Sequence, residues 1–324
     1  MISLASQQTT DSVLMIRPFR FGWNAETAAS NSYQAPPSVP SDQVHTRALR
    51  EFDGLRDRLE QAGVRVTVLS DLPTPHTPDS LFPNNWFSTH DDGTLALYPM
   101  ATPSRRAERR PHIIEALRSL GFLRTVDLRP HEDHERFLEG TGSLVLDRQA
   151  RIAYAAVSLR THPAVVADFA QALGYRSVIF STQTAQGQPV YHTNVLMSVG
   201  RTIAVICLDA IADSGQRRAV EAELARSGRE ILPISIAQMN EFAGNLLELR
   251  SQHGTAIWVL SSRAHAALLP EQRTRLSRDA RLVHAPLPTI EAIGGGSARC
   301  MLAELFHPPE WHAHAEPVRR PGCD

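Results

Sequence analysis

The sequence predicts an α/β fold built from a ββαβ unit that repeats about five times. An apolar strand, a turn, an amphipathic helix that ends near glycine and a further strand follow one another along most of the chain. Pairs of strand candidates joined by short polar turns lie between the helices. No linker rich in proline, glycine and serine divides the chain, and the units, of roughly 50–70 residues each, share architecture rather than residues. We expect one domain over 13–306, a disordered leader at 1–12 and a tail at 307–324.

The first unit begins with a strand at Val13–Pro18 and a loop at 24–40 that is rich in Asn, Ser and Pro. Ser41 is then placed to cap a helix that stops at Gly63, and a strand at 64–69 follows. The spacing of apolar residues predicts the buried face of this helix, which would carry Val44, Ala48, Phe52, Leu55 and Leu59.

Three later helices repeat the pattern. The residues predicted to cap them are Thr161, Ser214 and Ser262. Gly174 and Gly228 end the first two, and a strand follows each.

The predicted strand pairs lie at 86–99, 143–157 and 194–208. The first contains Asp92-Gly93, a dipeptide typical of tight hairpin turns.

Composition excludes several functional classes. The chain has 324 residues, a formal net charge of −1 and a sequence pI of about 6.9, so it lacks the basic excess of a nucleic-acid-binding protein. The densest basic run, at 105–110, is interpreted as the solvated start of a helix rather than an anion site. No apolar run is long enough to predict a membrane-spanning helix.

Cysteine usage indicates a reducing compartment, because the chain has only three cysteines. Cys207 lies in an apolar run typical of a core strand, and Cys323 lies in the expected tail. The N-terminus has neither the basic nor the apolar region of a signal peptide. We therefore expect a cytoplasmic protein.

Cys300 is the third cysteine, and it follows the run Gly294-Gly295-Gly296 in the segment GGGSARCM. A glycine-rich turn lets chain and substrate approach closely, and Arg299 beside the sulfur would favour a thiolate. The alternative is a buried small hydrophobic residue, the common fate of a free cysteine.

His192 and Glu139 strengthen the interpretation of Cys300 as a catalytic nucleophile. His192 is predicted to open a strand after a polar loop, and Glu139 precedes the predicted strand that follows LEGTG. Each alone could be structural. Together the three residues provide a nucleophile, an acid–base group and a carboxylate, which suffices for covalent catalysis.

Four segments together, GGGSARCM, LEGTGSLV, YHTNV and FPNNW, resemble the guanidine-modifying (pentein) superfamily. This superfamily includes arginine deiminases, dimethylarginine dimethylaminohydrolases and amidinotransferases, and the sequence most resembles the amidinotransferase-like citrulline utilization hydrolases. The resemblance runs from about Val13 to Phe306. It implies a five-bladed α/β propeller with pseudo-fivefold symmetry, which agrees with the repeated units.

The resemblance also implies roles for the three residues. Cys300 would attack the central carbon of a guanidino or ureido group, and His192 would act as general acid and base. Glu139 would hold the substrate nitrogens. The implied partner is a small amino-acid substrate, with no metal or organic cofactor, no nucleic acid and no membrane. The sequence leaves open whether the chain forms a homo-oligomer.

Three acidic positions of the resembled enzymes are not acidic in this chain. Asn85 replaces the aspartate of an F-x-R-D motif, Asn194 replaces that of H-x-D, and Gly142 replaces a third acid. A guanidinium is a cation with donors only, whereas a ureido group is neutral and has a carbonyl acceptor. Asparagine amides suit the ureido group better because they offer both donor and acceptor. The alternative is that another acid, such as Asp79, replaces the lost charge. The set of candidate substrate-binding residues is Asp79, Phe82, Asn84, Asn85, Asn194 and Arg299.

Citrulline hydrolysis to ornithine, ammonia and CO2 is therefore the first functional hypothesis. Deimination of arginine or hydrolysis of dimethylarginine is the second, and transfer of an amidino group to an acceptor amine is the third. A non-catalytic binding protein on the same propeller is the alternative from another class, since fold does not fix function. A cysteine peptidase is disfavoured because its cysteine usually precedes its histidine.

Overall fold

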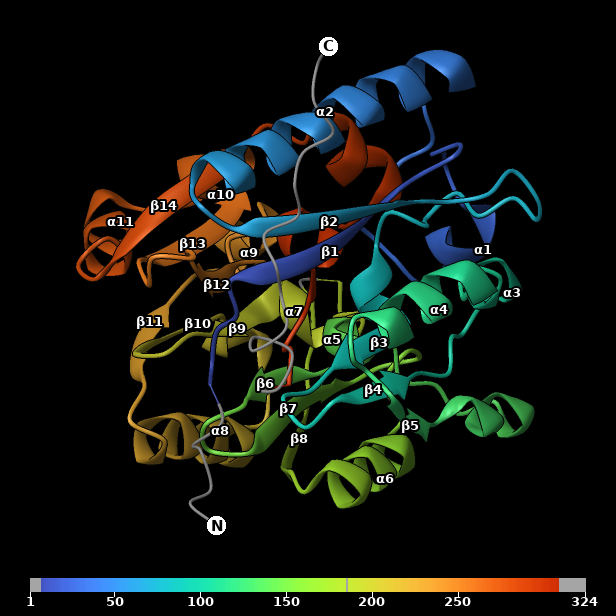
Figure 1. Ribbon diagram of the computed structural model, residues 1–324. Coiled ribbons are helices and arrows are strands. Elements are labelled where there is room, and N and C mark those ends of the chain that lie inside the picture. Colours follow the sequence, from blue (N-terminus) through green and yellow to red (C-terminus); the bar gives the residue numbers. More distant parts are fainter. Residues whose placement is uncertain (1–6, 185, 309–324) are drawn as a thin grey trace.

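Five three-stranded sheets form the framework of the computed structural model, which describes residues 7–184 and 186–308 (Figure 1). In every sheet the middle strand pairs antiparallel with one neighbour and parallel with the other. This is the predicted ββαβ unit, and it occurs five times. The sheets, each with its middle strand second, are β15–β1–β2 (Ala303–Glu304, Ser12–Arg17, Arg65–Ser70), β3–β4–β5 (Phe87–Thr89, Thr94–Leu97, Arg124–Asp127), β6–β7–β8 (Val145–Asp147, Ile152–Val157, Arg176–Ser181), β9–β10–β11 (Met197–Val199, Ile203–Ile206, Glu230–Pro233) and β12–β13–β14 (Leu247–Arg250, Ala256–Ser261, Ala280–Ala285).

Helices connect the parallel strands of each sheet, because a parallel pair needs a crossover. Short helical turns precede the first strands of the sheets or complete the loops. The helices are α1 (Ala25–Ala28), α2 (Ser41–Gln61), α3 (Pro103–Arg106), α4 (Pro111–Ser119), α5 (Gly140–Ser143), α6 (Pro163–Leu173), α7 (Thr193–Leu196), α8 (Ser214–Arg226), α9 (Ile236–Asn240), α10 (Ser262–Ala267) and α11 (Pro270–Leu276). Single turns of 3-10 helix cover Pro83–Asn85, Arg129–His134, Leu208–Ala210 and Ala298–Met301, and a π-helical turn covers Ile290–Gly294.

The caps at the helix N-termini differ from the prediction by one residue. The cap of α6 is His162, whose Nδ1 accepts the N–H of Ala164, rather than Thr161. The cap of α8 is Asp213, whose carboxylate is a stronger acceptor than the hydroxyl of Ser214. Ser41 and Ser262 are likewise the first helical residues, preceded by Pro40 and Ser261.

The predicted helix ends are confirmed. Gly63, Gly174 and Gly228 follow α2, α6 and α8 with φ of 86°, 67° and 78°, a conformation that glycine adopts without a steric penalty. The hairpin turn is also confirmed, since Gly93 has φ of 78° between the antiparallel strands β3 and β4.

Successive sheets contact one another around the molecule. In Figure 1 they lie about a common centre, with β1 and β2 at the top, β12–β14 at upper left, β6–β8 below and β3–β5 at the right. Contacts join β15 to β3, β6 to β9 and β9 to β12, and β13 to the turn at 298–301. The last strand, β15, therefore completes the first sheet by pairing with β1.

Some residues that the sequence analysis placed in the N-terminal leader or the C-terminal tail are packed against the sheets. Gln8–Ser12, placed in the leader, are buried, and His307, placed in the tail, is buried as well. The remainder of the expected tail, with Cys323, lies outside the described residues.

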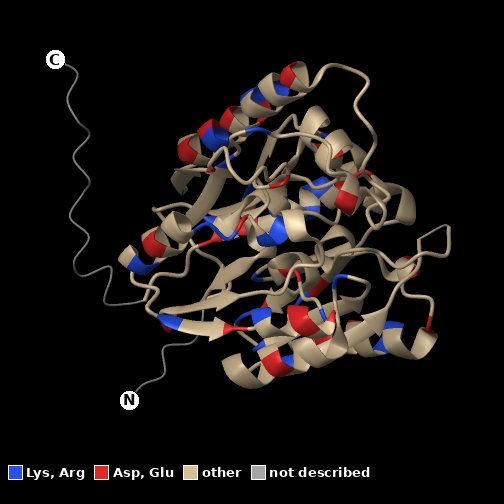
Figure 2. Ribbon diagram, turned by 90° about the vertical axis from the view of Figure 1, so that its right-hand side faces the viewer, with Lys and Arg blue, Asp and Glu red and all other residues tan. Residues whose placement is uncertain are grey.

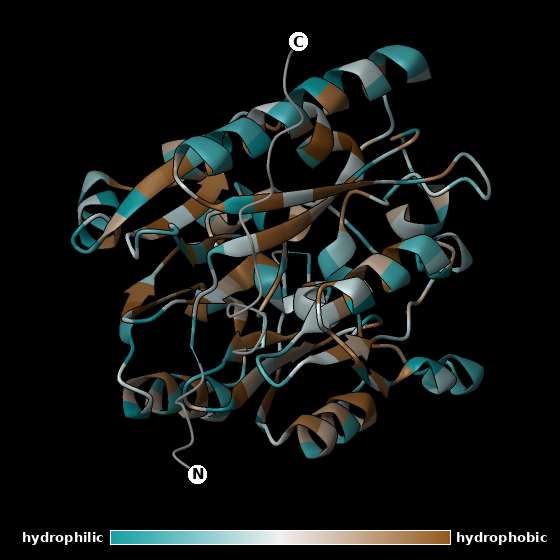
Figure 3. Cartoon of the chain, in the orientation of Figure 1, coloured by the Kyte–Doolittle hydropathy of each residue, from teal (hydrophilic) through white to brown (hydrophobic). Residues whose placement is uncertain are grey.

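The apolar residues gather on the strands and on the inner faces of the helices (Figure 3). The five residues predicted for the buried face of α2 are all at most 1% exposed. Cys207 is fully buried in the core as expected, and burial raises the pKa of its thiol to about 11. Acidic and basic residues are interspersed along α2 (Figure 2). In the part of the chain that the structure describes, no helix is both long enough and apolar enough to cross a bilayer.

Candidate active site

Five short turns, one in front of the first strand of each sheet, carry the residues of the candidate site. Asn85, Gly142, Asn194, Asn245 and Cys300 lie two or three residues before β3, β6, β9, β12 and β15. These equivalent positions converge. The sulfur of Cys300 lies 3.6 Å from Nδ2 of Asn194 and 3.3 Å from Nδ2 of Asn245. A Cβ atom added to Gly142 would lie 2.4 Å from Nδ2 of Asn85.

Sequence reasoning did not identify Asn245. The signal that could have found it is its position in the repeat, since it precedes its strand as Asn85 and Asn194 precede theirs.

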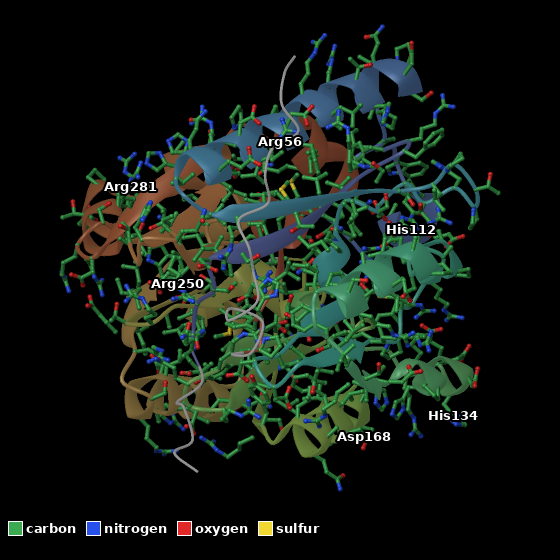
Figure 4. All side chains as sticks on the ribbon, in the orientation of Figure 1. Arg56, His112, His134, Asp168, Arg250 and Arg281 are labelled. Atoms are coloured by element: carbon green, nitrogen blue, oxygen red, sulfur yellow. The ribbon has the colours of Figure 1, made fainter. Side chains whose placement is uncertain are left out.

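A narrow cavity lies beside Cys300. Cys300 and His192 line it, and both are nearly inaccessible to solvent, at 3% and 2% exposure. By contrast, the labelled side chains of His112 and His134 in Figure 4 lie at the outer surface. The other lining residues are Thr27, Asn31, Asp79, Phe82, Asn85, Arg105, Arg160, Tyr191, Gly294 and Gly296.

His192 and Glu139 form a buried pair in which Nε2 of the histidine lies 2.8 Å from Oε2 of the glutamate. Each precedes a single helical turn, α7 or α5, rather than opening a strand as the sequence suggested. Burial lowers the pKa of His192 to about 4, although the bond to Glu139 opposes this. The resting imidazole is therefore neutral. Since a carboxylate only accepts, Nε2 carries the proton and Nδ1 has a free lone pair.

Glu139 is ionised. Burial alone would raise the pKa of this carboxyl, but the guanidinium of Arg160, 3.4 Å away, and the hydrogen bond from His192 hold it well below its ordinary value. Arg160 also donates to the carbonyl of Thr27 and to Ser30, so it joins the loop after α1 to the site.

Arg105 lies beneath the cavity and corrects the interpretation of the basic run at 105–110. Its side chain is 2% exposed, not solvated, and it forms a buried bidentate pair with Glu108. Its Nη1 donates to Oδ1 of Asn85 at 2.8 Å. Arg110 is also buried and pairs with Asp71. Hydrophobic periodicity could not reveal these contacts, because the partners are distant in sequence or lie in the same charged run.

Asp79 and Phe82 form another part of the cavity wall. Oδ2 of Asp79 accepts from Asn24 at 2.8 Å and from Thr27 at 3.2 Å, whereas Oδ1 has no partner among the described residues. Burial raises the pKa of this carboxyl, with Arg105 acting in the opposite direction. The ring of Phe82 packs so closely on Gly294 and Gly296 that a Cβ at either glycine would lie 2.9 Å from it. These glycines are therefore needed for close approach.

Arg299 and Asn84 do not line the cavity beside Cys300. The guanidinium of Arg299 is directed to Glu304, at 3.0 Å, and to the carbonyl of Leu302. It lines a separate cavity together with Arg148 and Glu248. The side chain of Asn84 is fully buried, and neither of its polar atoms has a partner in the described chain. Asn194 contacts the sulfur rather than the cavity wall.

A loop held by several hydrogen bonds presents Cys300. Gly295 has φ of 65°, and its carbonyl accepts from the hydroxyl of Tyr191 at 2.5 Å and from Asn31 at 3.3 Å. Ser297 donates to the buried carboxylate of Glu291 at 2.6 Å. These contacts fix the backbone on the N-terminal side of the cysteine.

Comparison with solved structures finds the same fold in enzymes of arginine metabolism. The N-terminal domain of ArgZ, an arginine dihydrolase from the ornithine–ammonia cycle in cyanobacteria, aligns with a TM-score of 0.72 and 16% identity over 92% of this chain and 98% of that domain. Full-length ArgZ is longer, and this chain covers 41% of it. AgrE bound to L-arginine gives a TM-score of 0.72 and 18% identity over 92% of this chain and 40% of AgrE.

A dimethylarginine dimethylaminohydrolase, solved as an adduct with S-methyl-L-thiocitrulline, is also similar. Its TM-score is 0.64, with 13% identity over 92% of this chain and all of that one. No curated protein matches the chain.

The match to a family model places the protein in the pentein superfamily of guanidine-modifying enzymes, as the sequence motifs predicted. The model of one family, described as N,N dimethylarginine dimethylhydrolase, eukaryotic, matches residues 17–307. The chain belongs to that family, and with it to the hydrolases that act on carbon–nitrogen bonds other than peptide bonds.

Proposed function

We propose that the protein hydrolyses the ureido group of citrulline, with Cys300 as nucleophile, to give ornithine, ammonia and CO2. The observation that carries this proposal is the orientation of Asn85. Arg105 has only donors, so the atom of Asn85 that it contacts at 2.8 Å is the carbonyl oxygen. The amide nitrogen is then the free end, and it has no partner among the described residues. Asn85 therefore offers the cavity a donor.

A donor at this position distinguishes the two substrate classes. The carbonyl oxygen of a ureido group accepts a hydrogen bond, whereas a guanidinium brings further donors and a charge. Leaving a buried donor unpaired costs about 1–3 kcal/mol. The neutral ureido group is the better fit to Asn85.

The chemistry follows in two stages. The thiol proton passes to Nδ1 of neutral His192, and the sulfur attacks the ureido carbon. The imidazolium, stabilised by ionised Glu139, gives its proton to the terminal nitrogen, which leaves as ammonia. The product of this stage is a thiocarbamate that joins the substrate to Cys300.

Hydrolysis completes the reaction. Neutral His192 takes a proton from water, the resulting hydroxide attacks the thiocarbamate carbon, and the sulfur leaves and recovers its proton. The carbamate formed loses CO2 and gives ornithine. Over both stages one citrulline and one water give ornithine, ammonia and CO2.

The amino-acid end of the substrate would bind on the opposite wall of the cavity. The unpartnered Oδ1 of Asp79 is an acceptor suited to an α-ammonium group, and Arg160 supplies a positive charge for a carboxylate. We also infer that the five sheets form a five-bladed propeller over residues 13–306, an interpretation supported by the contacts that join each sheet to the next.

Hydrolysis of a methylated arginine is the second candidate, favoured by the family to which the chain belongs. It would require Asp79 to balance the guanidinium charge, because Asn85, Gly142 and Asn194 supply none. In that case the amide nitrogen of Asn85 would face a cation, which disfavours this substrate.

The test is kcat/KM for citrulline, arginine and dimethylarginine, with products identified by mass, in the wild type and in Asn85→Asp. Aspartate keeps the contact to Arg105 but replaces the donor by an acceptor. We expect the preference for citrulline over arginine to fall by roughly ten- to hundredfold, corresponding to about 1–3 kcal/mol. Asn240→Asp, which adds the same charge at an exposed position, is the matched control. Asn194 is left unchanged because an acid there would face the sulfur.

Cys300→Ala should abolish turnover of every substrate, and Cys207→Ala should preserve it. A wild-type enzyme that strongly prefers arginine or dimethylarginine, and that does not respond to Asn85→Asp, would contradict the citrulline assignment. Equal loss of activity in the two cysteine variants would contradict the assignment of the nucleophile.

A further inference from the structure

Asn245 is held in one orientation by its neighbours. Its Oδ1 accepts the backbone N–H of Arg299 at 3.1 Å, and its Nδ2 donates to the backbone carbonyl of Asn194 at 3.0 Å. Since an N–H only donates and a carbonyl only accepts, the amide of Asn245 is not free to flip. The same Nδ2 lies 3.3 Å from the sulfur of Cys300. Asn245 is fully buried, so water does not compete for this contact.

We propose that Asn245 is a catalytic residue that stabilises Cys300 as a thiolate and directs its sulfur at the substrate, an inference that rests on the proposed role of Cys300 as nucleophile. A thiolate at 3% exposure receives little solvation, and a buried anion needs hydrogen-bond donors or a nearby cation. The second hydrogen of Nδ2 provides such a donor, while the first is used by Asn194.

Among the described residues no cationic side chain is hydrogen-bonded to the sulfur, and the guanidinium of Arg299 acts on it only at longer range. The guanidinium of Arg299, the neighbour in sequence, pairs with Glu304 and turns away from the cavity that Cys300 lines. His192 is neutral until it accepts the thiol proton, and its Nε2 is hydrogen-bonded to ionised Glu139 rather than to the sulfur. The amides of Asn245 and, at the longer distance of 3.6 Å, Asn194 are therefore the donors that contact the sulfur.

The repeat explains how these amides reach the sulfur. Asn194, Asn245 and Cys300 occupy equivalent positions before the first strands of three consecutive sheets, so their side chains point to the same region. Asn245 makes the shorter contact and is the one bonded to both neighbouring turns. For these two reasons Asn245 is the principal hydrogen-bond donor to the thiolate, and Asn194 is the secondary donor.

Two substitutions distinguish a purely structural role of Asn245 from a role in stabilising the thiolate. Asn245→Asp keeps the shape and the acceptor for Arg299 but replaces the donor by a negative oxygen. Asn245→Ala removes both hydrogen-bonding atoms without adding charge. If the amide only joins the turns, both variants lose the bond to the Asn194 carbonyl and both are destabilised, but the reactivity of Cys300 in the folded proteins differs little between them. If the amide stabilises the thiolate, the aspartate variant has the less reactive Cys300.

The experiment measures the rate at which iodoacetamide alkylates Cys300 as a function of pH, with the modified peptide identified by mass and no substrate present. We expect Asn245→Asp to slow alkylation at neutral pH by about tenfold or more, with a smaller effect in Asn245→Ala, because only the thiolate reacts. The ultraviolet absorbance of the thiolate, corrected with Cys300→Ala, should fall in the same order. Melting temperatures check that both variants fold, and Asn240→Asp is the control for added charge.

The reverse order of the two variants, or wild-type alkylation in a folded Asn245→Asp protein, overturns the inference. The inference about Asn245 and the proposed function can fail independently of each other. If the wild type does not hydrolyse citrulline but Asn245→Asp still slows alkylation, the function fails and the role of Asn245 stands. If citrulline is hydrolysed and alkylation is unchanged, only the role of Asn245 fails.

Discussion

At the scale of single residues, burial and hydrogen bonding set the protonation states that the proposed chemistry needs. Burial keeps His192 neutral, so it is able to accept a proton, while Arg160 and His192 together keep Glu139 ionised. The pair thus resembles a base held by a fixed anion, an arrangement typical of nucleophilic catalysis. Asn85 and Asn245 have the same side chain, yet Arg105 and the backbone of Arg299 orient each amide so that its nitrogen faces the site.

The neutral state of His192 has a consequence for stability. Its pKa is about 4 in the folded protein, against an ordinary value of 6.5. As the pH falls from about 6.5 to about 4, the unfolded chain binds a proton at this residue and the folded chain does not, so the free energy of unfolding decreases. The expected loss is about 3 kcal/mol at most, since one pKa unit corresponds to ~1.4 kcal/mol.

Urea unfolding at about pH 7 and about pH 4.5 tests this expectation in the wild type and in His192→Gln. Glutamine retains a donor for Glu139 but does not titrate, so its protein should lose less stability between the two values. The other buried histidines of the described residues, His90 and His307, are present in both proteins and cancel in the difference. The same pH dependence in both would mean that His192 does not remain neutral.

At the scale of elements, the short turns before the first strands matter more than the strands themselves. Four of the five turns are short helical turns that end next to a strand or one residue before it, so a residue in them is presented at the end of a sheet. The turn α5 begins at Gly140, whose φ of 46° favours glycine. Its Gly142 leaves the space that Asn85 and His192 occupy.

Gly142→Ala should therefore damage the site. The added Cβ would lie 2.4 Å from Nδ2 of Asn85 and 2.7 Å from Nδ1 of His192, and both side chains are anchored by their own partners. We expect a loss of stability of about 1–3 kcal/mol and a fall in kcat/KM on the order of 100-fold, because a small misplacement of reacting groups is costly.

Gly54→Ala is the matched control. In the described chain nothing lies within 4 Å of a Cβ at Gly54, which is inside α2. Alanine there should stabilise the protein by about 0.5–1 kcal/mol and leave kcat/KM unchanged. Unchanged activity in Gly142→Ala would show that the turn has room to adjust.

At the scale of the whole molecule, contacts between sheets complete the fold. Gln8 is one such contact, because its Nε2 donates to the carbonyls of Leu146 in β6 and Val199 in β9, each at 2.9 Å, and its Oε1 accepts from the N–H of Arg148. The side chain is 6% exposed and therefore links two adjacent sheets to the segment that leads into β1.

We expect Gln8→Ala to lower the free energy of unfolding by about 2–4 kcal/mol, since it removes three buried hydrogen bonds and leaves backbone groups unpaired. Gln7→Ala, which changes an exposed neighbour, should have little effect. Denaturant unfolding of the two variants provides the measurement. Equal stability would mean that this link between the sheets contributes little.

The sequence by itself determined the repeated ββαβ unit, the glycine ends of α2, α6 and α8, and the superfamily. These follow from periodicity, turn chemistry and short motifs, all of which act over neighbouring residues. The capping residues were missed by one position because competing acceptors lie side by side, as Asp213 and Ser214 do.

Only the tertiary structure decided which side chains meet at the sulfur and what surrounds them. Arg105 was interpreted as solvated and is buried, Arg299 was expected beside the thiolate and pairs with Glu304, and Asn245 was not considered. The orientation of an amide, the charge of a buried histidine and the space at Gly142 depend on partners that are distant in sequence. Local patterns do not encode such partners, because five separate turns must first be brought together by the packing of the sheets.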